Sequence, residues 1–373
     1  MHIIGKNYKH IIFFEKDLTK SSGYSYIYSY FSSFKKVKVV VKSHNHELNF
    51  IQPKYRLILI FFLLPFLYLI KNLNKILLSK NNLTSQDCDT LIVGHPSAFI
   101  FITYLLKFKT DVYAVDTLFS YYDGKCENFF IRKLILFIAN SLDRYILFAS
   151  DSNYFLNTYS KRLFQKLSIS STKIKSLPVG IDKNKIFLLR KSFNIKKEKE
   201  KFIGIYSNFL YIEHQVFMNN LIKCFNDDLI NFFKSSYKVK LAGLYSDELL
   251  KVHSFSNPKL NEIFISDGYF DSLVEWLAKV DFIIIPFITT CGIKIKVLEA
   301  LASCKPVMIN CSFLEHIPQD FTNLFPSIFV YSDLNRETIY KFIEFSNEYY
   351  LSSRHKKTSQ NLYKLDWENM LKN

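Results

Sequence analysis

The sequence has no closely spaced cysteines. Its six cysteines are scattered along 373 residues: Cys88, Cys126, Cys224, Cys291, Cys304 and Cys311. Structural zinc sites need ligand pairs a few residues apart, so this spacing argues against one. The sequence also lacks the pattern of a cleavable signal peptide with a small-residue cleavage site. We therefore expect free thiols in a reducing, cytoplasmic environment.

The sequence also lacks an apolar run of the length that spans a bilayer. The run Leu57–Ile70 contains Pro65 and falls short of the roughly 20 residues that a spanning helix needs. It is flanked by the basic residues Lys54, Arg56, Lys71 and Lys75. The run is either an interfacial helix on an anionic membrane or a core helix. Its basic flanks favour the membrane, and we expect a peripheral location on the cytoplasmic face of the inner membrane.

Acidic residues are scarce, above all at the beginning of the chain. The whole chain has 49 Lys and Arg against 33 Asp and Glu, a formal net charge of +16, and residues 1–80 contain only Glu15, Asp17 and Glu47 as carboxylates. A basic chain can bind nucleic acid, but no helix-turn-helix, zinc-finger, RNP-type or Gly-Arg pattern is present. We expect an anionic membrane surface as a partner, and we expect that the chain does not bind nucleic acid.

Paired carboxylates with a metal-binding pattern are also few. Asp87-Cys88-Asp89 has the Asp-x-Asp spacing, but it leads into an apolar strand, and two carboxylates alone make a poor metal site. We expect no bound metal and no cofactor.

Short apolar runs alternate with amphipathic stretches along the chain, which is typical of βαβ units and parallel sheets. In the first half, expected strands are His10–Phe14, Val37–Val41, Thr90–Val93, Val112–Val115, Tyr145–Phe148 and Ile174–Leu177. Expected helices include Phe129–Leu142 and Ser152–Lys166. In the second half, expected strands are Phe202–Tyr206, Lys238–Leu241, Ile263–Ser266, Phe282–Pro286, Val307–Asn310 and Ile328–Tyr331. The charged stretch Lys196–Lys201 separates the two series as a solvated connector.

The segment Pro286–Asn310 carries the most chemistry. A glycine-containing loop runs into a short predicted helix with Lys296 and Glu299, and an apolar strand follows. Amide groups at a helix start favour an anion, a lysine in the first turn adds a charge, and a carboxylate on the same face accepts hydrogen bonds from hydroxyls. A nucleotide-linked sugar fits this combination. Taken alone, a surface Lys–Glu helix pair is the alternative.

The order of the surrounding motifs resembles the GT-B nucleotide-sugar glycosyltransferases, especially family 4. The segment from Gly292 through Glu299 to Cys304-Lys-Pro306-Val307 resembles the family's glycine loop, glutamate and Ala-x-Ala-x-Gly-x-Pro-Val. The family's interdomain turn is similar to Leu177-Pro-Val-Gly180-Ile-Asp182. Its "Ala-Asp … Val-Ser" strand is similar to Leu142-Asp143-Arg to Ala149-Ser150, and one of its strand ends is similar to Leu241-Ala-Gly243. The resemblance implies an α/β GT-B fold, with two doubly wound Rossmann-like domains facing a central cleft.

Two positions depart from the family pattern. Cys291 stands where family 4 enzymes have a first glutamate, and Cys304 stands where glycine is usual. The Gly292-Ile293-Lys294-Ile-Lys296 form is similar to a branch of bacterial polysaccharide transferases and to the membrane-associated xanthan glucuronosyltransferase. By that resemblance Lys296 binds the donor pyrophosphate and has a catalytic role, and Glu299 binds the ribose or the sugar.

Other candidate residues lie at expected strand ends. Asp116 is the candidate catalytic base if the reaction inverts configuration; otherwise it orients the acceptor, or simply caps a helix. Acceptor-binding candidates are Lys20, Ser21, Ser22 and His95, and each of these also suits an ordinary loop or cap position. Donor-binding candidates are Ser207, Gly243, Tyr269, Gly292, Ile293, Lys294, Lys296 and Glu299.

Together these features predict a metal-independent hexosyltransferase that moves a sugar from a nucleotide-sugar donor to a hydroxyl of a lipid-linked or growing bacterial surface glycan. Residues 1–185 would form the acceptor-binding, membrane-surface domain and 186–345 the donor domain, and a helical tail, 346–373, would pack back on the first domain. A catalytically silent scaffold in a glycan assembly complex, or a sugar-nucleotide epimerase of the same fold, remains an alternative.

Overall fold

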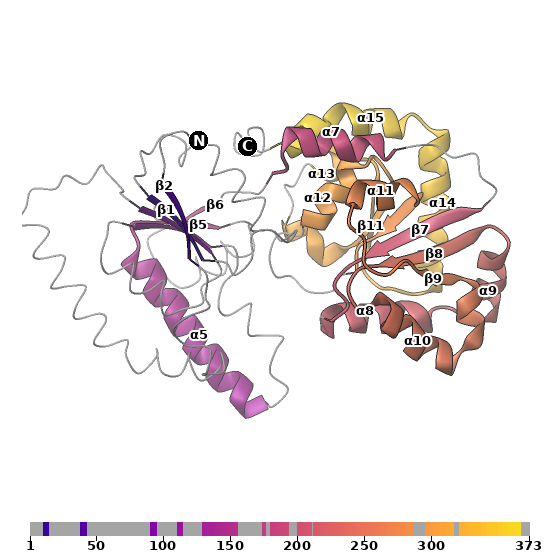
Figure 1. The fold of residues 1–373 in the computed structure, drawn as a ribbon, viewed down its shortest axis with the longest axis horizontal. Coiled ribbons are helices and arrows are strands. Elements are labelled where there is room, and N and C mark those ends of the chain that lie inside the picture. Colours follow the sequence, from indigo (N-terminus) through magenta and orange to yellow (C-terminus); the bar gives the residue numbers. More distant parts are fainter. Residues whose placement is uncertain are drawn as a thin grey trace, which may run out of the picture. The chain divides into compact units, whose positions relative to one another are not determined.

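The computed structural model describes residues 10–14, 38–42, 90–94, 110–114, 129–155, 174–176, 180–193, 200–210, 212–286, 295–316 and 321–366. The chain divides into two compact units between Val179 and Gly180. Each unit contains a six-stranded sheet in which every pair of neighbouring strands is parallel. The predicted α/β class with two doubly wound sheets is therefore confirmed (Figure 1).

The first unit is built on the strand order β2-β1-β3-β4-β5-β6. Its strands are β1 (His10–Phe14), β2 (Lys38–Lys42), β3 (Thr90–Gly94), β4 (Thr110–Ala114), β5 (Ser152–Phe155) and β6 (Ile174–Ser176). Its described helix is α5 (Phe129–Ala149). In the described part of the chain, no helix is both long and apolar enough to cross a membrane. The Leu57–Ile70 run and residues 196–199 of the predicted connector lie outside the described residues, whereas Lys201, its last residue, begins β7.

One strand prediction in this unit is wrong. Tyr145–Phe148 belongs to α5, and the strand is β5, at the position where the sequence predicted a helix from Ser152. The residues that α5 buries are spaced three, four and seven apart, as in a helix: Ile135, Ile138, Ala139, Leu142 and Tyr145. Tyr145 thus continues the buried face of α5. The resemblance of Leu142–Ser150 to a family strand is wrong for the same reason.

The second unit has the strand order β12-β11-β10-β7-β8-β9. Its strands are β7 (Lys201–Tyr206), β8 (Tyr237–Ala242), β9 (Phe264–Ser266), β10 (Phe282–Ile284), β11 (Val307–Asn310) and β12 (Ile328–Tyr331), close to the predicted ranges. Its α-helices are α7 (Lys183–Lys191), α8 (Ile212–Lys223), α9 (Asp227–Lys234), α10 (Ser246–Ser256), α11 (Leu273–Ala278), α12 (Ile295–Ala302), α13 (Phe321–Leu324), α14 (Arg336–Leu351) and α15 (Arg354–Asn361). Short 3₁₀ helices are η2 (Pro258–Glu262), η3 (Cys311–His316) and η4 (Leu362–Leu365).

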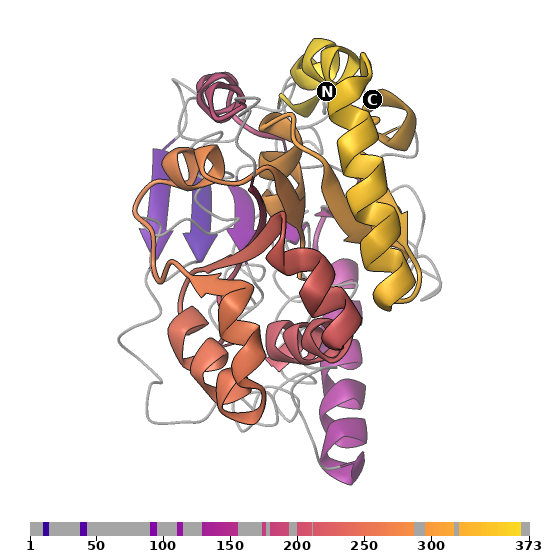
Figure 2. The ribbon, with the colours of Figure 1, turned by 90° about the vertical axis from the view of Figure 1, so that its right-hand side faces the viewer.

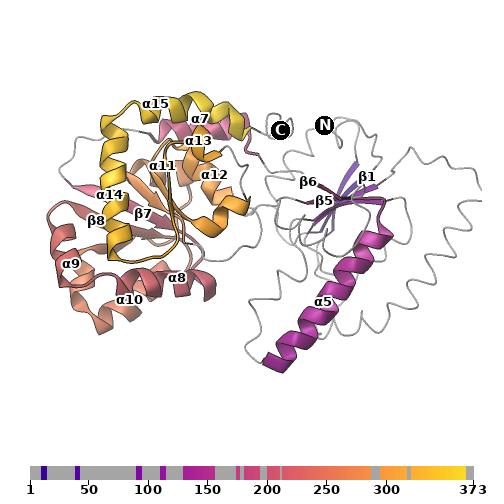
Figure 3. The same ribbon diagram turned by 180° about the vertical axis from the view of Figure 1, so that it is seen from behind.

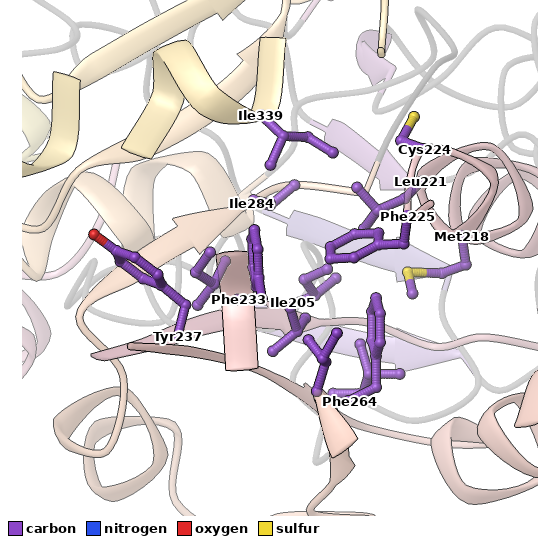
Figure 4. Packing of buried hydrophobic residues seen from close by; sticks show 14 of the residues in the cluster. Ile205, Met218, Leu221, Cys224, Phe225, Phe233, Tyr237, Phe264, Ile284 and Ile339 are labelled. Carbon is purple, nitrogen blue, oxygen red and sulfur yellow. The ribbon is translucent and has the colours of Figure 1, made fainter. Parts of the chain in front are cut away.

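Helices cover both faces of the second sheet. Helices α8, α9 and α10 lie on one side, and α11, α12 and α13 on the other, with α7 and α15 beyond them (Figures 1 and 3). α14 packs on the edge strand β12 (Figure 2). Strand residues such as Ile205 and Phe264 interlock with Met218, Phe225 and Phe233 of the helical layer (Figure 4). This apolar layer fixes the strands, and hence their carboxyl ends, in place.

The described part of the C-terminal tail packs on the second unit, whereas the sequence analysis expected it on the first. The Ile181 amide donates to the Leu365 carbonyl at 2.8 Å, and Asn361 Nδ2 donates to the Leu324 carbonyl at 2.7 Å. Leu362 and Leu365 are buried, and η4 contacts α7 and α12. The tail therefore covers apolar surface of the unit that contains α12.

Candidate functional site

The second sheet has a switch point between β7 and β10. From β7 the strand order runs outward through β8 and β9, and from its neighbour β10 outward through β11 and β12. In open α/β sheets, ligands bind outside the carboxyl ends of the strands at such a point. β7 ends at Tyr206, and the chain after β10 leads to α12 through residues 287–294, which lie outside the described residues. The carboxyl end of β7 and the beginning of α12 thus define the candidate site.

Lys296, in the first turn of α12, reaches the end of β7. Its Nζ donates a hydrogen bond to Ser207 Oγ at 2.8 Å and lies 5.8 Å from the centre of the Tyr206 ring. The Tyr206 hydroxyl donates to the Lys296 carbonyl at 3.0 Å. Burial, together with the negative charge of Glu299, raises the pKa of Tyr206 well above its usual value, so this hydroxyl keeps its proton at neutral pH. These contacts hold a cation at the switch point.

Ser207 is buried, with 5% of its surface exposed, beside the buried His214 of α8. His214 Nδ1 lies 2.6 Å from the Asn208 carbonyl oxygen, which can only accept, so we assign the proton to Nδ1. Ser207 Oγ lies 2.8 Å from this same nitrogen, which therefore cannot accept the Ser207 proton, and Nε2 at 3.5 Å is too distant for a good bond. Ser207 Oγ thus accepts from Lys296, and the hydrogen bond that its own proton can make to Nε2 is long, at 3.5 Å.

Glu299 lies one turn after Lys296 and pairs with a residue of a different helix. Its side chain is 8% exposed, and its Oε1 lies 2.9 Å from Nζ of Lys185, on α7. The Lys185 side chain is 31% exposed. α7 is capped by Asp182, whose carboxylate accepts from the backbone amides of Asn184 and Lys185. The predicted interdomain turn therefore begins the helix that brings a second lysine to α12.

Gly243 allows the chain after β8 to pass close to Ser207. Its φ is +120°, and a Cβ at this position would lie 1.9 Å from the Ser207 carbonyl oxygen. The Gly243 amide donates to the carbonyl of Gly268, which precedes Tyr269. Only glycine fits a positive φ at such a close approach.

Tyr269 is 69% exposed and lies at the end of a series of aromatic rings. Its ring centre is 6.2 Å from Phe270, which stacks on Trp276 at 5.6 Å, and Trp276 lies 5.5 Å from Tyr206. An exposed ring supported in this way offers a flat apolar surface next to the site.

The structure brings several predicted donor residues together. Lys296 contacts Ser207, Glu299 shares its helix, and Gly243 packs against Ser207. Asp116, Lys20, Ser21, Ser22, His95, Cys291, Gly292, Ile293 and Lys294 lie outside the described residues. All of the assigned roles stay predictions. Among the described residues, no group of three or more His, Cys, Asp or Glu side chains could hold a metal ion.

Sequence reasoning missed three residues of the site: Lys185, Tyr206 and His214. For Lys185 a signal existed, because Asp182 in an N-cap position predicts a helix with Lys185 in its first turn. Tyr206 and His214 had none, since a tyrosine at a strand end and a single histidine on a helix are common core residues.

No protein-family profile matches the sequence, and no curated protein matches it significantly. Many solved structures do share its fold. A glycosyltransferase from Rickettsia africae is 12% identical, with 98% of this chain and 96% of that one covered and a TM-score of 0.58. Anabaena HepE, in complex with UDP and glucose, is 13% identical, with 98% of each chain covered and a TM-score of 0.59. WaaG, a glycosyltransferase involved in lipopolysaccharide biosynthesis, is 14% identical, with 96% and 98% covered and a TM-score of 0.58. The chain therefore has the GT-B fold.

Proposed function

We propose that the chain is a glycosyltransferase that transfers a sugar from a nucleotide-sugar donor to a hydroxyl of a lipid-linked or growing bacterial surface glycan. The observation that carries this proposal is the pair of hydrogen-bond donors at the switch point of the second sheet. The ammonium of Lys296 is held against Ser207, and the Ser207 hydroxyl can make only a long hydrogen bond, of 3.5 Å, to Nε2 of His214. A diphosphate is the ligand that suits a cation and a hydroxyl donor in this position.

In this reaction, bonds to the anomeric carbon of the donor sugar are exchanged. The acceptor oxygen forms a bond to that carbon, the bond from the carbon to the donor phosphate breaks, and the nucleoside diphosphate leaves with its negative charge. Lys296 and the Ser207 hydroxyl stabilise that charge, which is greatest as the bond breaks. We assign the acceptor proton to Asp116, two residues beyond the end of β4, if configuration inverts. The proposed reaction uses no metal and no cofactor.

The class of substrate is supported by two proteins of the same fold. HepE was solved with UDP and glucose, and WaaG is described as acting in lipopolysaccharide biosynthesis. The excess of Lys and Arg at the beginning of the chain, with the apolar run Leu57–Ile70, supports peripheral binding of an anionic membrane. We accordingly propose that the enzyme works at the cytoplasmic face of the inner membrane, where lipid-linked acceptors are assembled.

The test of the donor site is the variant Lys296→Ala. We expect it to weaken binding of UDP, ADP or GDP, whichever the wild-type protein binds, by tenfold or more, because a charge-assisted hydrogen bond to phosphate is worth about 1.5–3 kcal/mol. Isothermal titration calorimetry measures this affinity. Lys341→Ala is the matched control, since Lys341 lies on α14 and forms an exposed ion pair with Glu337. Equal affinities for wild type and Lys296→Ala would contradict the proposed site.

Transfer itself is tested by incubating the protein with a panel of nucleotide sugars and a bacterial lipid extract. Mass spectrometry should detect a glycan whose mass has grown by one sugar residue, together with the released nucleoside diphosphate. Binding without transfer or donor hydrolysis would point to a catalytically silent scaffold, for which Cys291 in place of the family's first glutamate is the motivating feature. A changed nucleotide sugar in the absence of acceptor would point to an epimerase.

A further inference from the structure

We propose that Lys185 is a positioning residue of the donor site: its ion pair orients the Glu299 carboxylate to accept hydroxyl groups of the nucleotide sugar. This inference rests on the proposed function but concerns a different part of the ligand from Lys296. Its basis is the ion pair of 2.9 Å between Lys185 Nζ and Glu299 Oε1, which joins α7 to α12.

The fold places Lys185 at this position through the turn that begins α7. The Asp182 carboxylate accepts from the amides of Asn184 at 2.8 Å and Lys185 at 3.3 Å, which fixes the first turn of the helix. Leu189, one turn further on, is fully buried, and α7 packs against α11 and α12. Figures 1 and 3 show α7 on the same side of the second sheet as α12. Lys185 therefore faces α12 because the neighbouring apolar side chains of α7 are anchored there.

The charges explain why Glu299 needs this partner. A carboxylate whose side chain is only 8% exposed loses most of its hydration, and a nearby cation offsets that loss. Lys296, on the same helix, donates to Ser207. Burial, and after it the negative charge of Glu299, raises the pKa of Tyr206 at the switch point. Lys185 thus compensates the negative charge of Glu299, while Lys296 contacts Ser207 at the proposed diphosphate site.

An ionised carboxylate is the acceptor that hydroxyl groups require. It offers two oxygens with about four acceptor positions, and the ion pair with Lys185 fixes the orientation of these positions. Removing the ammonium of Lys185 should therefore weaken recognition of the hydroxyl-bearing part of the ligand and spare recognition of its phosphates.

The experiment compares two kinds of probe on the full-length protein by calorimetry. One is UDP, ADP or GDP, which carry ribose hydroxyls, and the other is inorganic pyrophosphate, which carries none. We expect Lys185→Met to weaken binding of the nucleoside diphosphate about tenfold and to leave the pyrophosphate affinity unchanged. Lys185→Arg should restore the wild-type ratio of the two affinities. Lys191→Met, an exposed lysine in the last turn of the same helix, is the matched control and should change neither.

Coupling to Glu299 is tested in the Glu299→Gln background, where the negative charge is absent. There Lys185→Met should have no further effect on the ratio of the two affinities, and this double variant also avoids a buried unpaired carboxylate that could impair folding. Three results would overturn the inference. Lys185→Met could weaken the binding of both probes equally, it could leave both affinities unchanged, or it could change the ratio of the affinities as much in the Glu299→Gln background as in the wild type. A loss of pyrophosphate binding in Lys296→Ala would still support the proposed function in each case.

Discussion

At the scale of single residues, the site depends on close approaches that only particular side chains permit. The chain after β8 passes Ser207 so closely that Gly243 has no room for a Cβ. The Ser207 hydroxyl cannot donate to Nδ1 of His214, because that nitrogen donates its own proton to a backbone carbonyl. Neither relation follows from the residue types, since glycines at strand ends are ordinary turn residues.

Gly243→Ala should destabilise the protein severely. We expect a loss on the order of 3 kcal/mol or more, because a left-handed backbone and a contact of 1.9 Å with the Ser207 carbonyl oxygen act together. Chemical denaturation measures the free energy of unfolding. Gly268→Ala is the matched comparison: its φ is +63°, its nearest contact is a flexible Asp247 oxygen at 3.3 Å, and its loss should be about 1–2 kcal/mol. Similar losses for the two variants would show that the approach to Ser207 is not rigid.

At the scale of elements, helix starts and buried faces decide what the short apolar runs become. Tyr145 continues the buried face of α5, and the run that it begins is helical although its composition suits a strand. In the second unit, β7, β8, β11 and β12 fall close to their predicted ranges because each is bounded by turn or charged residues. α7, which supplies Lys185, is one of the helices that the sequence analysis did not predict.

Removing the cap of α7 should affect both stability and binding. Asp182→Ala should lower the free energy of unfolding by about 1 kcal/mol, the usual cost of losing an N-cap side chain. It should also weaken nucleoside diphosphate binding, since the first turn of α7 carries Lys185. Asn335→Ala removes the equivalent cap of α14 and should cost similar stability without a change in affinity. Parallel denaturation and calorimetry of the two variants check this, and unchanged binding in Asp182→Ala would argue against a role for α7.

At the scale of the whole molecule, the chain consists of two compact units with the same kind of parallel sheet. The second unit contains the predicted donor residues that the structure describes, and the predicted acceptor residues follow strands of the first. The basic charge of residues 1–80 belongs to the first unit, so the two units differ in the partners that suit them. Under the proposed function, the donor is soluble and the acceptor is held at a membrane, so we assign them to different units.

Membrane binding is tested by sedimentation with lipid vesicles. We expect the protein to bind vesicles that contain phosphatidylglycerol more strongly than neutral vesicles, and the binding to weaken as salt screens the basic residues. Replacing the apolar residues between Phe61 and Leu69 with serine should release the protein from both kinds of vesicle. Circular dichroism of the variant serves as the control for folding. A folded variant that sediments with vesicles as the wild type does would refute the proposed role of this run.

Composition and periodicity were sufficient to predict an α/β protein with two parallel sheets, because buried strands and amphipathic helices each impose a local pattern on the chain. They also located Lys296 and Glu299 on one helix face. Tertiary structure alone decided which residues meet these two. Ser207 precedes Lys296 by 89 residues, and Lys185 reaches Glu299 from another helix. Such contacts depend on strand order and helix packing, which arise from the burial of the whole sheet and leave no mark in any short stretch of sequence.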